Sequence, residues 1–270
     1  MNASVPVSVV IPCFRCILTL ERAVVSVVRQ TALPQELILI DDCSGDDTRS
    51  LMVQLQSRYS QGWIRLVLLE SNVGAASARN AGWDLANGRF VAFLDADDAW
   101  HPRKIELQYK FMASSTDVVV TGHGHVQLDA LQDAEDVTEA EFQRVPTSYV
   151  FIKNPFVTPS FMVRKDLNFR FLTGRRYMED HYFLMQVSSA GLGIAKARVP
   201  LAFIFKPIFG ESGLSADLLQ MQRGELENYR LMGREGSISL FAVVLLEAYS
   251  WLKFCRRYAI VWVRSISKMK

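Results

Sequence analysis

Three carboxylates follow an apolar segment in the run Phe93-Leu94-Asp95-Ala96-Asp97-Asp98. Crowded carboxylates repel one another, so such a cluster either holds one raised pKa or shares a hard cation through its oxygens. If the extended geometry of the preceding strand persists, Asp95 and Asp97 point to the same side and Asp98 turns away. The run therefore predicts a Mn²⁺ or Mg²⁺ site at Asp95 and Asp97. A solvated turn that ends a strand is the structural alternative.

Polar or turn-forming residues also follow three other segments that are predicted to be strands. Ligands of open parallel sheets bind at the carboxyl ends of the strands, so these residues are candidates for the same site. A carboxylate such as Asp41 can accept the imide N–H of uracil or a ribose hydroxyl there, and a helix cap is its alternative role. The three strand ends are Pro12-Cys13-Phe14, Asp41-Asp42 and Asn72-Val73-Gly74.

Strand-like and helix-like segments alternate through the first half of the chain. Short β-branched apolar runs are typical of strands buried on both faces, and apolar residues at helical spacing lie between them. This alternation predicts an α/β fold with an open, mostly parallel sheet covered by helices. The predicted strands are 7–11, 37–40, 64–69 and 90–94, and the predicted helices are 20–28 (begun by Thr19 and closed by Pro34), 47–59, 75–85 and 102–112.

The second half of the chain is less regular. Its acidic, weakly periodic stretch at 129–141 predicts a surface excursion. The predicted elements are strands at 118–121 and 161–163, a helix at 179–190, and one or two strands at 194–205 that Pro200 interrupts.

The totals exclude some classes of protein. Half of the 270 residues are hydrophobic, which is enough for a large buried core and argues against a disordered chain. The net charge of +2 gives no indication of a nucleic-acid partner. Because the N-terminus has no charged start before a long apolar stretch, we expect no signal peptide and a cytoplasmic protein with free thiols. The pair Cys13-x-x-Cys16 lacks a second pair at zinc-site spacing, and we interpret it as a coincidence.

Five motifs, taken in order, resemble those of the family 2 glycosyltransferases. Each motif alone is weak, whereas the ordered set is highly specific and covers about residues 5–215. The resemblance implies the GT-A fold, with a Rossmann-like, mostly parallel sheet flanked by helices, and inverting transfer from a nucleotide diphosphate sugar. The motifs are Val9-Val10-Ile11-Pro12 with Phe14; Ile40-Asp41-Asp42-Cys43-Ser44 with Asp46 or Asp47; Asn72-Val73-Gly74 followed by Ala78-Arg79-Asn80; Phe93-Leu94-Asp95-Ala96-Asp97-Asp98; and Glu179-Asp180.

The resemblance also implies roles for individual residues. Asp95 and Asp97 bind manganese or magnesium against the donor diphosphate in similar enzymes. Asp180 corresponds to the base that removes the proton of the acceptor hydroxyl, with Glu179 as the second choice. A capping pair at the start of a helix is the structural alternative for these two carboxylates. The residues expected at the nucleotide are Pro12, Phe14, Asp41, Asp42, Gly74, Arg79, Asp95 and Ala96.

Some features depart from the family pattern or stay unassigned. Phe14-Arg15 stands where members commonly have tyrosine and asparagine, so a hydroxyl contact to the nucleotide is absent or comes from elsewhere, and base stacking by Phe14 remains open. The segment Ser212-Gly213-Leu214-Ser215 resembles a loop that closes the site, with an ordinary connection as the alternative. His123 and His125 share a strand face by parity, but none of the four histidines, including His101 and His181, is assigned to catalysis.

The C-terminal region is apolar and basic. Residues 238–263 are interrupted by charged side chains, which leaves no clean span of about 20 apolar residues for crossing a membrane. Lys253, Arg257 and Arg264 fall near one helical face, so the segment predicts helices that lie on an anionic inner leaflet. Packing on the catalytic domain or on a second subunit, as in a homo-oligomer, is the alternative.

These observations predict a catalytic domain over residues 1–215, with a nucleotide-binding half at about 1–121 and an acceptor-side half at about 122–215. A membrane-associating helical region follows over 216–270. The expected activity is metal-dependent transfer from a UDP-sugar to a glycan or lipid-linked acceptor in envelope polysaccharide synthesis, at the cytoplasmic face of the membrane.

Two alternatives remain from the same residues. A phosphohydrolase would use Asp95 as nucleophile, but no threonine follows at the place expected for that class. A membrane-attached, non-catalytic nucleotide-binding scaffold is the other, and the intact carboxylates argue against it.

Overall fold

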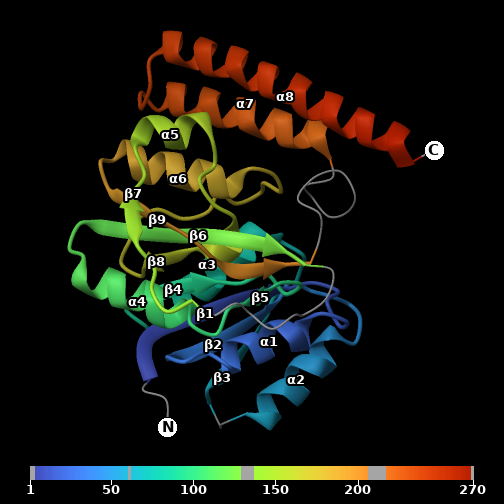
Figure 1. The fold of residues 1–270 in the computed structure, drawn as a ribbon. Coiled ribbons are helices and arrows are strands. Elements are labelled where there is room, and N and C mark those ends of the chain that lie inside the picture. The colour runs from blue at the N-terminus through green and yellow to red at the C-terminus, as the bar shows by residue number, and fades with distance from the viewer. Residues whose placement is uncertain (1–3, 60–61, 129–136, 206–216, 269–270) are drawn as a thin grey trace.

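The computed structural model describes residues 4–59, 62–128, 137–205 and 217–268. A central sheet lies between two layers of helices, and a hairpin of two longer helices covers one of these layers (Figure 1). The strands are β1 (Ser4–Cys13), β2 (Leu33–Asp41), β3 (Ile64–Leu68), β4 (Phe90–Phe93), β5 (Ala99–Trp100), β6 (Val118–Gln127), β7 (Phe142–Arg144), β8 (Met162–Arg164) and β9 (Gly193–Ile204). The helices are α1 (Leu20–Val28), α2 (Thr48–Arg58), α3 (Ala75–Leu85), α4 (Lys104–Ser114), α5 (Thr147–Ile152), α6 (Glu179–Ser189), α7 (Leu218–Arg234) and α8 (Leu240–Lys268), with the 3₁₀ turn η1 (Thr158–Ser160).

The sheet has the order β3-β2-β1-β4-β8-β6-β9-β5, and β7 pairs with β9. Strands β1 to β4 are parallel, as the alternation of strands and helices predicts, because a helix returns the chain to the same end of the sheet each time. The later strands make the sheet mixed: β8 is antiparallel to both β4 and β6, and β9 is parallel to β6.

The core consists of two apolar layers, one on each face of the sheet. In β1, Val10 belongs to the layer under α3, α5 and α6, whereas Val9 and Ile11 belong to the layer under α1, α2 and α4. This is the alternation expected of a strand buried on both faces. Both layers hold the carboxyl ends of β1, β2 and β4 together at one edge.

Two prolines lie inside strands rather than at breaks. Pro34 was expected to close the first helix, but it lies in β2 opposite Val5 of β1. Its missing N–H is tolerated because β3 pairs with β2 only from Leu37 onward. Pro200 was expected to interrupt β9, but the strand continues through it with a register shift opposite Gly124.

Strand β6 is longer than predicted and continues to Gln127. Register shifts in its pairing with β9 lie on both sides of Gly124. His123 is fully buried and His125 is half-buried, so the two rings have different environments. Of the other predicted loops, 129–136 and 209–215 lie outside the described residues.

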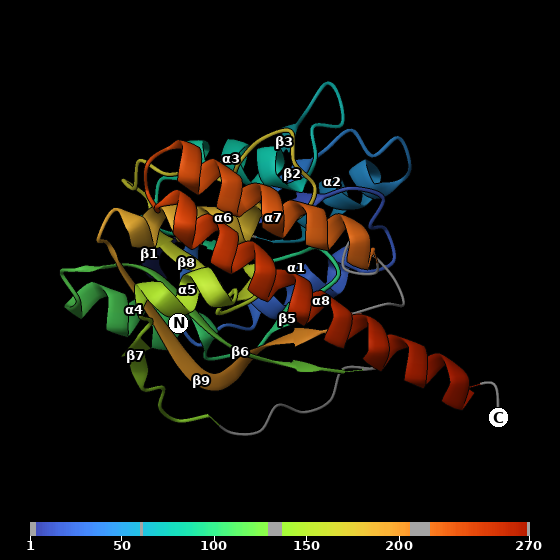
Figure 2. The same ribbon diagram turned by 90° about the horizontal axis from the view of Figure 1, so that it is seen from above.

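Three charged side chains of the C-terminal hairpin, Glu225, Lys253 and Arg257, form a cluster that faces inward. α7 and α8 run side by side over α5 and α6 (Figures 1 and 2). Glu225 of α7 is buried and accepts hydrogen bonds from Ser250 Oγ, Lys253 Nζ and Arg257 Nη2 of α8. Lys253 and Arg257 therefore face the protein, which corrects the prediction that they form a lipid-facing basic surface. In the part of the chain described, no helix is sufficiently long and apolar to cross a bilayer.

Candidate active site

The carboxylates after β4 lie on a turn. The strand ends at Phe93, and the amide of Asp98 donates to the carbonyl of Asp95 at 3.1 Å. The premise that extended geometry persists through the acidic run is therefore wrong. The side chains of Asp95 and Asp97 are half-buried, and the Arg22 guanidinium of α1 donates to the carbonyl of Asp97.

Arg79 joins this turn to the start of α6. Its guanidinium is buried, with Nη2 donating to Asp95 Oδ1 at 2.6 Å and Nη1 donating to Glu179 Oε1 at 3.2 Å. The predicted nucleotide residue Arg79 and the predicted metal ligand Asp95 are thus in direct contact. Because crowded carboxylates need a shared positive charge, this arginine is what allows the two acidic motifs to lie together.

Glu179 and Asp180 have different environments although they are adjacent. Burial, and next repulsion from Asp180, raise the pKa of Glu179 to about 7 against the opposing effect of Arg79. Burial and the like charge therefore outweigh the ion pair with Arg79. Asp180 is only half-buried, and its Oδ1 accepts from the amide of His181 at 2.7 Å at the N-terminus of α6.

Two residues beside Asp180 were missed from the sequence. Asn154 Nδ2 donates to Asp180 Oδ2 at 2.8 Å, and Thr158 Oγ1 donates to the same oxygen at 3.4 Å. Each precedes a proline, Asn154-Pro155 and Thr158-Pro159, and such dipeptides mark turns. That local signal indicates a loop, but nothing in it points to a carboxylate more than twenty residues away.

The two acids after β2 hold the neighbouring loops. Asp41 Oδ1 accepts from both the amide and the hydroxyl of Ser44, and both oxygens of Asp42 accept amides, from Val73 at 2.7 Å and from Gly74 at 2.9 Å. Gly74 has φ +84°, and open space surrounds the place where a Cβ would be, so glycine is needed for the backbone conformation rather than for a close approach.

The remaining predicted nucleotide residues line the same edge. Pro12 pairs with Ile40 where β1 and β2 end, and the Phe14 ring is 45% exposed with the Arg15 guanidinium 5.2 Å from its centroid. Ala96 is buried within the acidic turn. The structure thus brings all the predicted site residues to one edge of the sheet, together with the start of α6.

The rings of the buried His123 and His181 bond to backbone carbonyls rather than to the carboxylates of the site. Burial lowers the pKa of His123 and His181, and the ring nitrogens that they use contact the backbone carbonyls of Gly124 and Val150. Among the described residues, no group of three or more His, Cys, Asp or Glu is placed to hold a metal ion, and all four cysteines are free thiols.

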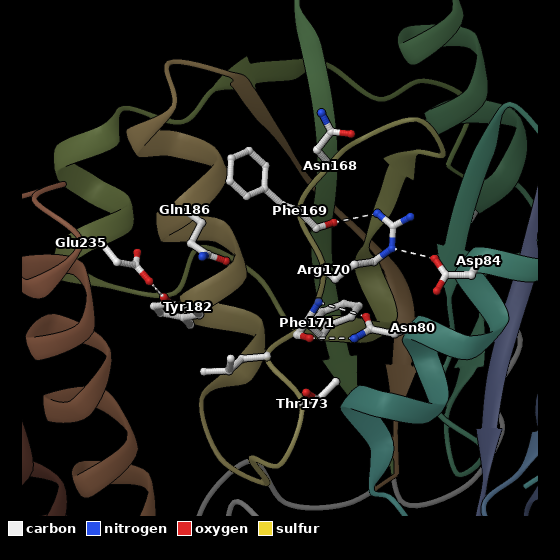
Figure 3. Close-up of a pocket in the computed structure, with 11 residues that line it drawn as sticks. Asn80, Asp84, Asn168, Phe169, Arg170, Phe171, Thr173, Tyr182, Gln186 and Glu235 are labelled. Atoms are coloured by element: carbon white, nitrogen blue, oxygen red, sulfur yellow. Dashed lines mark hydrogen bonds and ion pairs between the residues drawn. The ribbon is translucent and has the colours of Figure 1, made fainter.

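A separate hollow of about 540 Å³ lies between α3 and α6, beside the segment 168–173 (Figure 3). The Asp84–Arg170 and Tyr182–Glu235 contacts border it, and Asn80 bonds to the backbone of Phe171 at its base. None of the predicted site residues lines it, so we place the chemistry at the acidic edge of the sheet rather than here.

Solved structures share the fold. S. aureus TarS 1–349 in complex with UDP-GlcNAc matches with a TM-score of 0.66 at 18% identity, over 85% of this chain and 66% of that chain. The mannosyltransferase PcManGT from Pyrobaculum calidifontis, in complex with GDP-Man and Mn²⁺, matches with a TM-score of 0.66 at 16% identity, over 92% of this chain and 70% of that chain. The architecture is therefore of the GT-A type, as predicted.

The family follows from the sequence match. The model described as Glycosyl transferase family 2 matches residues 8–170, and the chain belongs to this family. It is similar to the Escherichia coli UDP-Glc:alpha-D-GlcNAc-diphosphoundecaprenol beta-1,3-glucosyltransferase WfgD, with 39% identity over 106 residues. These residues are 39% of this chain and 40% of WfgD. It is also similar to the succinoglycan biosynthesis protein ExoO of Rhizobium meliloti (strain 1021), with 30% identity over 166 residues. These residues are 60% of this chain and 45% of ExoO. The matched segments span less than half the length of these curated relatives.

Proposed function

We propose that the protein is an inverting glycosyltransferase that moves a sugar from a nucleotide diphosphate sugar to an acceptor hydroxyl. The observation that carries the proposal is the position of Arg79 between Asp95 and Glu179, which brings the donor-side acids and the acids of α6 to one site. Family membership supports the reaction class.

Asp180 is the proposed base. The acceptor oxygen attacks the anomeric carbon on the face opposite the nucleotide, its proton passes to Asp180, and the bond to the diphosphate breaks with its electron pair on the leaving oxygen. This single displacement inverts the configuration. Asn154 and Thr158 donate to Asp180 Oδ2 and orient the carboxylate. Glu179 is less suited because it is buried and, with a pKa of about 7, partly protonated at neutral pH.

Asp95 and Asp97 would hold Mn²⁺ or Mg²⁺. Their half-buried carboxylates offer the hard oxygen donors that these ions prefer, and Mg²⁺ sites commonly use one or two carboxylates with substrate phosphates and water. Such an ion, when bound, neutralises negative charge on the departing diphosphate.

The proposed donor is a UDP-sugar, held by Pro12, Phe14, Asp41, Asp42, Gly74, Arg79, Asp95 and Ala96. Asp41 uses Oδ1 for Ser44, and its Oδ2 has no protein partner within the described ranges, which leaves an acceptor for a nucleobase or ribose donor. The UDP-GlcNAc complex of TarS and the UDP-Glc in the name of WfgD support uridine. Because PcManGT is in complex with GDP-Man, GDP-sugars are the first alternative donors to compare with UDP-sugars.

The proposed acceptor is a glycan or lipid-linked sugar in envelope polysaccharide synthesis, by similarity to WfgD and ExoO. We further propose that residues 216–270 rest on the inner leaflet of the membrane. The outer side of α8 supports this, since Phe241, Val244 and Leu252 are 63–73% exposed. The contact would then be mainly apolar, because Lys253 and Arg257 are bound to Glu225.

Asp180→Asn tests the reaction. We expect the loss of sugar transfer, measured with a panel of UDP- and GDP-sugars, while calorimetry shows unchanged affinity for UDP in the presence of Mn²⁺. Asp84→Asn is the matched control, because Asp84 forms an exposed surface pair with Arg170. Near wild-type transfer by Asp180→Asn would show that the base assignment is wrong. A non-catalytic scaffold would bind a nucleotide sugar with the same affinity with or without Mn²⁺. A phosphohydrolase would show no preference for a nucleotide sugar as substrate.

A further inference from the structure

Three side chains from one segment hold three consecutive backbone carbonyls. Trp100 Nε1 donates to the carbonyl of Pro159 at 2.7 Å. Gln108 Nε2 donates to the carbonyl of Ser160 at 3.0 Å, and Lys104 Nζ to that of Phe161 at 3.4 Å. Lys104 and Gln108 are four residues apart on α4 and therefore lie on one side of the helix, and Trp100 in β5 precedes them. We call this set of three donors the carbonyl clamp.

The clamped segment, Pro159 to Phe161, also contacts the strand that leads to the donor side of the site. The carbonyl of Phe161 accepts the amide of Phe93 at 3.3 Å, and Phe93 is the last residue of β4 before Leu94 and Asp95. Trp100 itself follows the acidic turn by two residues. The clamp therefore connects the backbone on both sides of Asp95 to the backbone of Pro159 to Phe161.

On the other side, the clamped segment leads directly to the proposed base. Thr158 immediately precedes Pro159, and its hydroxyl is 3.4 Å from Asp180 Oδ2. Any shift of the carbonyls at 159–161 moves this hydroxyl relative to the carboxylate. Positional errors of about 1 Å can cost roughly 100-fold in rate when reacting groups must be aligned.

The cost of burying the Lys104 amine indicates that the carbonyl clamp does more than fill space in the core. Its side chain is completely buried, its Nζ is 3.8 Å from the centroid of the Trp100 ring, and it forms no ion pair with a carboxylate of the described residues. Burial lowers the pKa of Lys104 well below its usual value, so its ammonium form is disfavoured in the folded protein. An apolar residue of similar length would fill this place at a lower cost.

We propose that Trp100, Lys104 and Gln108 are positioning residues that fix the proposed base relative to the donor-side acidic turn. The proposal rests on the assignment of Asp180 in the proposed function. The clamp acts through Thr158 and touches no reacting atom itself.

Lys104→Met separates this role from a structural one. We expect kcat for sugar transfer to fall about tenfold, with the affinity for UDP and Mn²⁺ within about twofold of wild type and a melting temperature that is unchanged or higher. A purely structural lysine would leave kcat unchanged. Trp100→Phe, which removes the indole N–H and keeps an aromatic ring, serves as a second variant and should show the same split between kcat and donor affinity.

A double-mutant cycle tests the route through Thr158. Gln108→Met and Thr158→Val should each lower kcat, and the double variant should lose no more than the larger single loss, because Gln108 acts on Asp180 only through the Thr158 contact. Thr158→Ser keeps the hydroxyl and should retain kcat. Gln222→Met is the matched control, because Gln222 is also buried but donates to Ser250 within the distant hairpin.

The outcomes separate the two proposals. If Asp180→Asn is inactive while Lys104→Met, Gln108→Met and Trp100→Phe keep full kcat, the clamp is overturned and the base assignment stands. Fully additive losses in the cycle would also overturn it. Substantial turnover by Asp180→Asn would overturn both.

Discussion

The Arg79 guanidinium donates to Asp95 Oδ1 at 2.6 Å from the first turns of α3, sixteen residues earlier in the chain. Its other terminal nitrogen reaches Glu179, one hundred residues later. One buried cation thus neutralises acids from two separate motifs, and the site depends on it both for its shape and for its charge balance.

Arg79→Met should destabilise the protein by about 3–5 kcal/mol, because it leaves the buried Glu179 and the half-buried Asp95 without their shared cation. Urea unfolding at pH 7.5 would measure the change in the free energy of unfolding. Arg58→Met is the control, since Arg58 pairs with Glu21 on the exposed surface and should cost less than about 1 kcal/mol. Equal effects of the two changes would contradict the bridging role.

Glu179 should make the stability of the protein depend on pH. Its pKa is about 7 in the folded protein and is lower in the unfolded chain, so the folded state binds more protons between these values. Stability due to Glu179 is therefore fully present below about pH 4.3 and falls as the pH rises toward 7. The stability of Glu179→Gln relative to wild type should increase over this window by up to about 3 kcal/mol. Parallel pH profiles of the two proteins would refute the raised pKa.

Asn154→Ala should lower kcat by about tenfold or more, because Asp180 loses the amide that orients its Oδ2. Donor affinity should not change, since Asn154 lies on the acceptor side. Asn168→Ala at the separate hollow is the control and should behave as wild type. Steady-state kinetics with both substrates varied would make the distinction, and a change in donor KM alone would count against the assignment.

Glu225→Ala should release the C-terminal hairpin from the catalytic domain. It removes the acceptor of Ser250, Lys253 and Arg257 and leaves two partly buried cations unpaired, at a cost of about 3–5 kcal/mol. Burial raises the pKa of Glu225, but Lys253 and Ser250 lower it more, so its contribution is present at neutral pH and disappears as the pH falls through the lowered value.

Limited trypsin digestion at pH 7.5 would detect this release as faster cleavage in α7 and α8. Glu247→Ala, which removes a more exposed pair with Arg230, should give a nearly normal digestion pattern. The proposed anchoring role would be wrong if the two variants were cleaved at the same rate.

The outer face of α8 should control binding to membranes. Phe241→Asp or Leu252→Asp should reduce flotation with vesicles that contain anionic phospholipid, and truncation after Gly236 should abolish it. Leu219→Asp is the control, because Leu219 is 57% exposed but lies on α7. If the α8 variants float like wild type but a purified dimer dissociates, the face binds a second copy of the chain instead.

Several features were accessible from local sequence. The buried β-branched runs predict β1 and β2, the spacing of Leu20, Ala23, Val24 and Val27 predicts α1, and 75–85 is α3 without any correction. These patterns depend on which face of one element is apolar, and that information is contained within a few neighbouring residues. The motifs that follow the predicted strands also indicated, from local sequence, that their acidic residues lie at one edge of the sheet.

Other features depend on partners that are distant in the chain. The inward direction of Lys253 follows from Glu225 on a different helix, and the passage of β9 through Pro200 follows from its pairing with β6. A helical wheel or a local break signal treats each element alone and therefore gave the wrong expectation in both cases.

The sequence by itself determined the GT-A class, the position of the acidic strand ends and the candidate carboxylates, because each is carried by short motifs and local periodicity. Only the tertiary structure decided that Arg79 bridges Asp95 and Glu179, that Asn154 and Thr158 bond to Asp180, and that three carbonyls are held from Trp100 to Gln108. The physical reason is that burial and hydrogen bonding are properties of the packed layers, which bring together groups that no local pattern connects.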